Sequence, residues 1–157
     1  MPQLSLHSPL GDLTISEEDG VIVAVDWGWG RDQEPTPLLG EARAQLHAYF
    51  DRRLIRFDLP MAPAGTPYRQ RVWAALREIP AGQVRTYADI AAVAGGAARS
   101  VGQANGANPI PVLIPCHRVV AVAGANGRWT SAGIGGYSAG DGATTKRFLL
   151  QLEARAA

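Results

Sequence analysis

A short stretch containing two prolines and a glycine, Pro60 to Gly65, divides this chain of 157 residues into two unlike halves. Before it, short apolar runs are separated by turn residues, which is typical of antiparallel strands. After it, apolar residues recur at helical spacing. Proline and glycine interrupt both kinds of element, so we predict two domains, residues 1–62 and 63–157. With 46% apolar residues, the chain has enough material for two small cores or one larger core.

The first half predicts an α/β domain, a three-stranded antiparallel meander followed by a helix. Residues Leu4–His7, Leu13–Ile15 and Val21–Trp27 are the expected strands, with turns at 9–11 and 16–20. Thr36 followed by proline has the form of a helix N-cap, and apolar residues then repeat at helical spacing to about residue 52. Residues 55–59 are expected to add one more strand.

The second half predicts a mainly helical domain. Helices are expected from residue 67 to about 79, from 87 to 94, from 97 to 106 and from 144 to 155. Thr86 and Asp89 have the spacing of a capping box, which marks the start of the second of these helices. The second and third helices, joined by two glycines, resemble a helix-turn-helix, although many such hairpins bind nothing. Residues 124–142 are expected to be mostly loop.

Composition excludes several classes of protein. A single cysteine excludes an intramolecular disulfide framework and any zinc site with several cysteines. No apolar run has the length of a membrane span and the N-terminus lacks a signal-peptide pattern, which favours a cytoplasmic location. Residues 1–65 sum to a charge of −5 and residues 66–157 to +6. A basic half suits an anionic polymer such as nucleic acid, and ordinary scatter of charge explains it equally well.

The only cysteine, Cys116, lies between mostly β-branched apolar residues and is expected in a buried, extended segment. A lone cysteine in such surroundings is most often a structural core residue. His117 and Arg118 directly after it favour a nucleophile instead, because histidine can act as a base for a thiol and arginine favours the thiolate. On a strand, however, His117 would face away from the thiol and reach it only through a bend or a water.

The string from Pro115 to Val119, Pro-Cys-His-Arg-Val, resembles the active-site signature of the O6-alkylguanine-DNA alkyltransferases. Further blocks of this family occur in the right order: Ser8 to Gly11, Gln45-Leu46, Tyr49-Phe50, Gly65 to Pro67, Val72-Trp73, Ile79 to Gly82, Thr86-Tyr87, Ala98-Arg99, Asn108-Pro109 and Lys146 to Glu153. The resemblance covers nearly the whole chain. It implies an RNase H-like sheet with a helix, followed by a winged-helix-type domain that contains the helix-turn-helix.

The resemblance implies direct DNA repair by a protein that reacts only once. The alkyl group of an O6-alkylguanine would move to Cys116 after the base leaves the double-stranded DNA, and the thioether product would not be reversed. His117 would take the thiol proton through a water, and Glu153 would hold the imidazole. The same resemblance implies a monomer that needs no cofactor. Some members bind zinc in the first domain, but this half has no cysteine and we predict no metal.

The resemblance also assigns residues that touch DNA. The helix at 97–106 would enter the minor groove, where small residues allow a close approach, with contacts from Ala98, Ser100 and Gln103. Arg99 would fill the gap that the flipped base leaves. Tyr87 would help to rotate the 3′ phosphate and donate a hydrogen bond to the guanine.

The remaining assignments concern the pocket. Asn108 would form the turn ahead of the active-site segment, and the backbone of Cys116 and Val119 would read the guanine edge. The pocket set is completed by Pro115, Arg118, Tyr137 and Ser138, the last two on a loop that closes over the base. Two loops, 120–137 and 138–146, are longer than in many members, and both border the alkyl pocket.

Three other classes of protein compete with this interpretation. Alkyltransferase-like proteins bind alkylguanine without repairing it, but they carry tryptophan where Cys116 stands. A plain helix-turn-helix regulator would not need the Pro-Cys-His-Arg string. A cysteine hydrolase would turn over ester or amide substrates, and it would normally draw its histidine from far along the chain.

Overall fold

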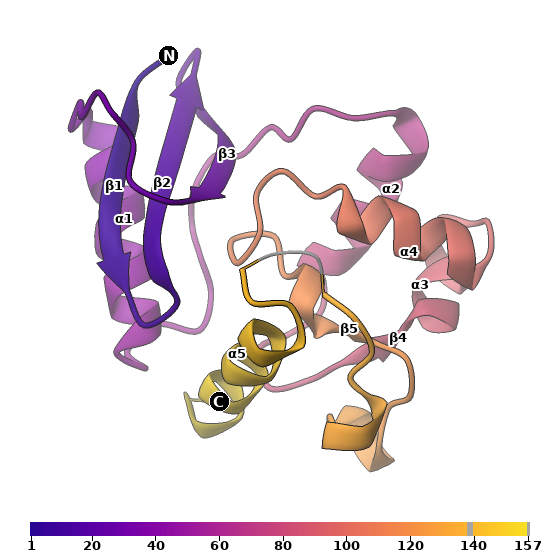
Figure 1. The fold of residues 1–157 in the computed structure, drawn as a ribbon. Coiled ribbons are helices and arrows are strands. Elements are labelled where there is room, and N and C mark those ends of the chain that lie inside the picture. Colours follow the sequence, from indigo (N-terminus) through magenta and orange to yellow (C-terminus); the bar gives the residue numbers. More distant parts are fainter. Residues whose placement is uncertain (138–139, 157) are drawn as a thin grey trace.

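The computed structural model describes residues 1–137 and 140–156 (Figure 1). Its first half is a three-stranded antiparallel sheet in the order β1 (Gln3–Ser8), β2 (Gly11–Glu18) and β3 (Val21–Trp27). The predicted meander is therefore confirmed. Strand β2 is longer than expected, because residues 17 and 18 pair with β3 through a bulge and the chain reverses only at Asp19-Gly20.

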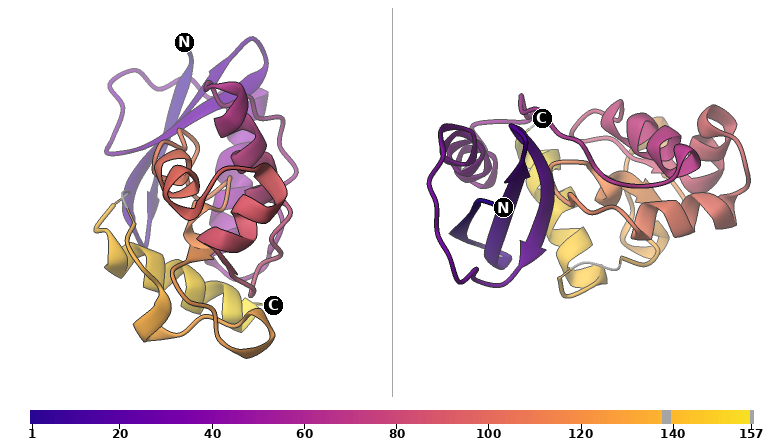
Figure 2. Two further views of the ribbon diagram at one scale, coloured as in Figure 1. Left: turned by 90° about the vertical axis from the view of Figure 1, so that its right-hand side faces the viewer. Right: turned by 90° about the horizontal axis from the view of Figure 1, so that it is seen from above.

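Helix α1 (Pro37–Phe50) packs against β1 and β2. It begins as the sequence predicts, with the Thr36 hydroxyl accepting a hydrogen bond of 3.1 Å from the backbone of Leu39. Seen from above, α1 covers the sheet on the side away from the second half of the chain (Figure 2). Strand β3 is the edge strand closest to the second half of the chain (Figure 1). The backbone N–H of its Val25 donates to the carbonyl of Pro109 at 3.0 Å.

The prediction of a strand at Ile55–Leu59 was wrong. The segment has no ladder partner, because the Gln45 side chain on α1 bonds both the N–H and the carbonyl of Asp58, at 2.9 and 3.1 Å. Only Met61, just after it, makes an isolated parallel bridge with Ile22 of β3.

The second half contains α2 (Pro67–Arg77), α3 (Tyr87–Ala94), α4 (Ala98–Gly106) and α5 (Ala143–Ala156). The capping box of Thr86 and Asp89 is present, and Thr66 caps α2 in the same way as Thr36 caps α1. Two short strands, β4 (Arg85–Thr86) and β5 (Val119–Val120), pair in parallel and were not predicted. They place the start of α3 beside the segment that follows Cys116.

The segment around Cys116 is not a strand, contrary to our expectation. Residues Cys116–Arg118 form one turn of 3-10 helix, preceded by a tight turn in which the N–H of Ile114 bonds the carbonyl of Ile110 at 2.9 Å. Val112 in this turn has a φ of 72°, which is uncommon for a β-branched residue. Prolines 111 and 115 explain the difference, because neither offers an N–H to a strand ladder. Residues 124–142, expected as loop, contain two further turns of 3-10 helix at Ala125–Gly127 and Ser131–Gly133.

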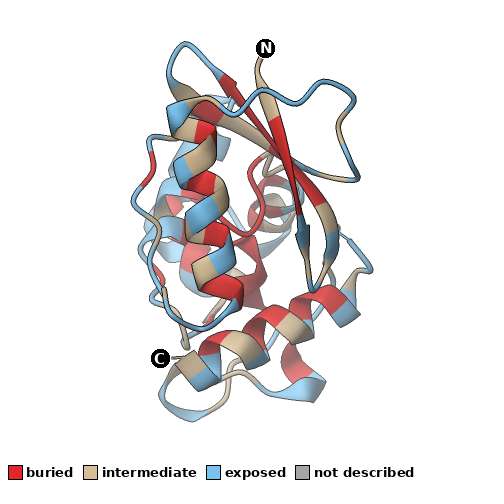
Figure 3. Cartoon of the chain, turned by 90° about the vertical axis from the view of Figure 1, so that its left-hand side faces the viewer, coloured by how far each residue is buried: buried red, intermediate tan, exposed pale blue. Residues whose placement is uncertain are grey.

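One core runs through both halves of the molecule. Its buried side chains extend from Leu13 and Leu46 in the first half to Trp73, Val101 and Leu149 in the second. Figure 3 shows the buried positions of α1 and α5 on the faces that these helices turn inward. Within the described residues, no helix is both long enough and apolar enough to cross a bilayer.

Candidate active site at Cys116

The thiol of Cys116 lies at the start of the 3-10 turn and only 4% of the residue is exposed. Its Sγ is 3.7 Å from the hydroxyl of Tyr137. Burial raises the pKa of the thiol, while hydrogen bonds from Asn108 and Tyr137 and the charge of Lys146 oppose the rise. The resting group is therefore a protonated thiol that needs a base before it can act as a nucleophile.

The base nearest in sequence, His117, is fully buried and turned toward α5. Its Nε2 lies 2.7 Å from Oε2 of Glu153. Burial lowers the pKa of His117, and the Glu153 carboxylate opposes this effect. Its Nδ1 is buried and has no hydrogen-bond partner among the described residues. With Nε2–H donated to Glu153, Nδ1 carries the lone pair and can accept a proton.

Glu153 accepts hydrogen bonds from three side chains at once. Besides His117, Arg118 donates from Nε to Oε1 at 2.9 Å and from Nη2 to Oε2 at 2.8 Å, and the Tyr49 hydroxyl donates to Oε2 at 2.5 Å. Burial alone would raise the pKa of Glu153, but His117 and Arg118 hold it well below its usual range. The carboxylate is therefore ionised, and the bidentate arginine compensates its charge in the interior.

Two asparagines fix the backbone around the thiol. The Asn108 side chain spans the tight turn, donating to the carbonyl of Ile114 at 2.9 Å and accepting from the N–H of Ile110 at 3.0 Å. This placement agrees with the turn that the sequence assigned to it. Asn105, on α4, donates to the carbonyl of Cys116 at 3.1 Å, so the helix-turn-helix is tied directly to the reactive residue.

A cavity of about 260 Å³ opens between α4 and the loop before α5. Its lining residues are Tyr87, Gly102, Asn105, Gly106, Gly136 and Tyr137. Cys116 is not among these lining residues, but Tyr137, whose hydroxyl lies 3.7 Å from its Sγ, is. Burial, followed by the charge of Cys116, raises the pKa of Tyr87, so this phenol remains a protonated hydrogen-bond donor. Ser138, the other loop residue that the sequence selected, lies outside the described residues.

Lys146, on α5, contacts the loop that lines the cavity. It is fully buried, its Nζ donates to the carbonyl of Gly136 at 3.0 Å, and it lies 6.0 Å from the centre of the Tyr87 ring. Burial lowers the pKa of Lys146 to about 8, against the attraction of the Cys116 charge. Lys146 therefore holds the loop that lines the cavity and adds positive charge near the thiol.

Of the residues predicted to touch DNA, four lie on α4 and the fifth, Tyr87, is the first residue of α3. Ala98, Arg99 and Gln103 are exposed on α4, and within the described part of the chain no hydrogen bond or ion pair engages Arg99. Ser100 is half-buried, and its hydroxyl caps the helix by accepting from the N–H of Ala97 at 3.0 Å. The same hydroxyl lies 2.9 Å from the Tyr68 hydroxyl.

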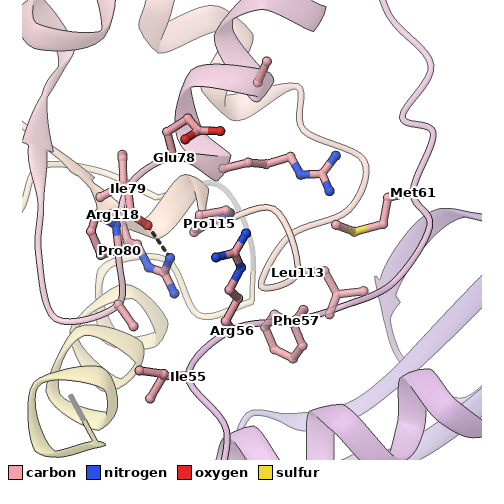
Figure 4. A pocket seen from close by; sticks show the side chains of 13 residues that line it. Ile55, Arg56, Phe57, Met61, Glu78, Ile79, Pro80, Leu113, Pro115 and Arg118 are labelled. Carbon is pink, nitrogen blue, oxygen red and sulfur yellow. Dashed lines mark hydrogen bonds between the residues drawn. The ribbon is translucent and has the colours of Figure 1, made fainter.

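A second cavity, of about 490 Å³, lies behind Arg118 and does not include the thiol among its lining residues (Figure 4). Pro115 and Arg118, both expected in the alkyl pocket, line this second cavity. Val119, also expected there, is buried in β5. Among the described residues, no group of three or more His, Cys, Asp or Glu side chains could hold a metal ion.

Sequence reasoning missed three residues that shape the site: Tyr49, Asn105 and Lys146. The only signal was chemical, since a tyrosine hydroxyl, an amide and the chain's single lysine each need a polar partner when buried. Which partner each would find depends on contacts between elements as far apart as α1 and α5.

Both halves of the chain are similar to known proteins. Residues 4–63 match the family model described as "6-O-methylguanine DNA methyltransferase, ribonuclease-like domain", and residues 67–155 match the corresponding "DNA binding domain". A constitutive methylated-DNA–protein-cysteine methyltransferase of Bacillus subtilis is 43% identical over 160 residues, covering 94% of this chain and 92% of the relative. A Mycobacterium tuberculosis protein of the same description is 42% identical, with 95% and 90% coverage.

Solved structures are similar over the full length. A M. tuberculosis O6-methylguanine methyltransferase has a TM-score of 0.79 at 37% identity and covers 99% of this chain and 94% of its own. A structure of a M. tuberculosis relative in complex with DNA has a TM-score of 0.82 at 38% identity, covering 100% of this chain and 95% of its own. On both family models and on these relatives, the chain belongs to the 6-O-methylguanine DNA methyltransferase family.

Proposed function

We propose that this protein repairs DNA directly, by moving the alkyl group of an O6-alkylguanine to Cys116 in a single, irreversible reaction. The observation that carries the proposal is the state of His117. Its Nε2 is engaged by an ionised carboxylate, while its buried Nδ1 has a free lone pair next to the residue that bears the thiol.

The thiol has to lose its proton before it can react, and a side chain has to accept that proton. In this proposal His117 accepts the Cys116 proton through a water, and Glu153 stabilises the imidazolium that results. The thiolate then attacks the alkyl carbon, so that the S–C bond forms while the bond from carbon to O6 breaks. The guanine is left with the electron pair and takes up a proton from solvent, and we assign the phenol of Tyr87 as a hydrogen-bond donor to it.

The substrate has to be extruded from the duplex, because only 4% of Cys116 is exposed. Helix α4 presents small residues and the free cation of Arg99 beside the cavity that Tyr87 and Tyr137 line. We assign Arg99 to the space that the flipped base vacates, with Ala98, Ser100 and Gln103 along the groove. The loop at Tyr137 and Ser138 would cover the base.

The finer parts of the proposal concern how the protein works as a whole. We propose that it acts as a monomer, since thiol, base and carboxylate all come from one chain, and that it works in the cytoplasm and without a cofactor. We also propose that the chain forms two domains with different roles, residues 1–62 and 63–157. The second part carries DNA binding and chemistry, and the first part supports Glu153 through Tyr49.

The experiment that tests the proposal is intact-protein mass spectrometry after incubation with a duplex containing one O6-methylguanine. We expect a gain of one methyl group, mapped to Cys116, which saturates at one per chain. Cys116→Ser is the control and should gain nothing. Tight binding of the lesion duplex without methylation would indicate a sensor, and repeated turnover of an ester or amide would indicate a hydrolase; either result would overturn the proposal.

A further inference from the structure

The second cavity lies where three segments meet: the linker after α1, the C-terminal end of α2 and the segment before Cys116 (Figure 4). It has a volume of about 490 Å³. Three arginines line it, Arg56 from the linker, Arg77 from α2 and Arg118 from the active-site turn. None of these arginines lines the first cavity, which lies beside Tyr87 and Tyr137.

The two outer arginines are uncompensated. Arg56 and Arg77 are exposed, and in the described part of the chain neither makes a hydrogen bond or an ion pair. The two carboxylates nearest to them in the lining, Glu78 of this cavity and Asp58 of the adjoining one, do not pair with them. The two guanidinium groups in this cavity repel each other, and the lining carboxylate Glu78 pairs with neither of them.

The inner arginine supplies a buried donor. Arg118 is only 6% exposed, and its guanidinium makes three hydrogen bonds, two to Glu153 and one of 2.6 Å to the carbonyl of Ile79. A guanidinium has five N–H donors, so two remain for a ligand in the cavity that Arg118 lines. A buried donor with unused capacity distinguishes this cavity from a patch of surface charge.

We infer that this cavity is a binding site for a phosphate group. Guanidinium forks match the oxygens of a tetrahedral oxyanion, and three of them in one cavity favour a multiply charged anion over a simple carboxylate. A free phosphate or pyrophosphate and a phosphate of a nucleic-acid backbone present the same chemistry. The site goes beyond the alkyl transfer proposed above and does not depend on it.

A ligand at this site should affect the hydrogen-bonded cluster of Arg118, Glu153 and His117. Arg118 both lines the cavity and donates to Glu153, and Glu153 in turn bonds His117. A phosphate near Arg118 therefore changes the electric field at the imidazole. His7 and His47 lie in the first half of the chain and are not part of this cluster, so the resonances of His117 report on occupancy.

The test is a titration of the full-length protein with inorganic phosphate and pyrophosphate, followed by calorimetry and by histidine NMR. We expect saturable binding at one site per chain, with the His117 resonances shifting along the same curve. Arg56→Ala and Arg77→Ala should each weaken binding by about tenfold, the loss typical of one charge-assisted hydrogen bond. Arg53→Ala is the matched control, because Arg53 is exposed and pairs with Asp51 at 3.2 Å outside the cavity.

Two further measurements separate the sources of the phosphate and the two proposals. A lesion-free duplex should displace bound phosphate if a nucleic-acid backbone is the natural ligand, and should leave it bound if the ligand is free in solution. Methylation of Cys116 in the arginine variants should still reach one group per chain, which keeps alkyl transfer separate from phosphate binding. Unsaturable binding, or equal losses in Arg53→Ala and Arg56→Ala, would reduce the effect to overall charge and overturn the inference.

Discussion

Glu153 links α5 to two other parts of the fold, because Tyr49 of α1 and both His117 and Arg118 of the turn at Cys116 bond to its carboxylate. Replacing the carboxylate by an amide in Glu153→Gln leaves the buried guanidinium without a countercharge. Losing one partner of a buried ion pair costs about 3–5 kcal/mol. We expect the free energy of unfolding, measured by urea denaturation, to fall by that amount and alkyl transfer to be lost.

The matched variant is Tyr49→Phe, which removes one hydrogen bond to the same carboxylate but leaves both charges in place. A hydrogen bond to a charged group contributes about 1.5–3 kcal/mol. We expect a smaller loss of stability than in Glu153→Gln and a reaction with free O6-benzylguanine that is slowed but still reaches completion. Equal effects of the two substitutions would contradict the role given to the Arg118–Glu153 pair.

Stability should depend on pH through the same cluster. Burial lowers the pKa of His117, and the ion pairs hold that of Glu153 below its usual range. In both cases the unfolded chain binds more protons than the folded chain, so the free energy of unfolding falls on acidification. The fall should begin below about pH 6.5 from His117 and steepen below about pH 4.3 from Glu153. Urea midpoints measured across this range should show both steps, and Glu153→Gln should lack the lower one.

The turn between α3 and α4 is held from outside by α2. The Tyr68 hydroxyl donates to the carbonyl of Gly95 at 3.0 Å and lies 2.9 Å from the Ser100 hydroxyl, while Arg71 donates to the carbonyl of Ala94 at 3.1 Å. Gly95 and Gly96 have φ values of 92° and 76°, which few other residues adopt. The position of α4 thus depends on side chains of another helix as well as on its own cap.

Tyr68→Phe keeps the ring and removes the hydroxyl that contacts Gly95 and Ser100. At about 1 kcal/mol for a neutral hydrogen bond, we expect alkyl transfer from duplex DNA to slow by roughly fivefold. The reaction with free O6-benzylguanine needs no groove contact and should be unchanged. A kinetic comparison of the two substrates checks this, and an equal loss on both would place Tyr68 in general stability instead.

Arg99→Ala is the corresponding test of the helix surface. Because Arg99 is exposed and unpaired in the described structure, its removal should leave the free energy of unfolding unchanged within about 0.5 kcal/mol. Repair of duplex DNA should weaken while reaction with the free base does not. Affinity for the duplex should also fall with added salt, and the slope should be smaller in the variant than in the parent.

At the level of elements, the sequence predicted what local chemistry controls. Threonine caps, prolines at the first helical position and the glycine turn set the boundaries of α1 to α4 within a residue or two. The prediction failed where non-local bonds decide, as at Ile55–Leu59, where the Gln45 side chain bonds the backbone of Asp58. It failed again at Cys116, where apolar β-branched neighbours suggested a strand and the two prolines imposed turns.

At the scale of the whole molecule, the main core continues from the sheet to α5, and only a smaller cluster of Val84, Val120, Ile134 and Leu150 lies apart from it. We therefore expect both halves to unfold in one transition. Variants that keep only Trp27 in β3 or only Trp73 in α2 as the fluorescent residue should show the same urea midpoint. Separate midpoints would mean that the halves are independent despite their shared core.

The contact between Tyr49 and Glu153 shows why this unity was not predicted. The two residues are 104 positions apart, and each belongs to a helix whose own pattern explains it. Family resemblance supplied the pairing of His117 with Glu153, but not the tyrosine that completes it. Local periodicity assigns residues to elements, whereas the pairing of buried polar groups between elements appears only once the elements are packed.

The burial of Cys116 also matters before the protein encounters a damaged base. A protein that is consumed by its own reaction is useful only if each copy remains intact while it waits. Oxidation by peroxides or disulfides begins with attack by the thiolate, so it requires both a thiolate and access to it. With 4% of Cys116 exposed and its pKa raised by burial, the resting sulfur offers neither. The fold thus keeps this sulfur protonated and shielded from oxidants until, in the proposed reaction, a nucleobase is brought to it.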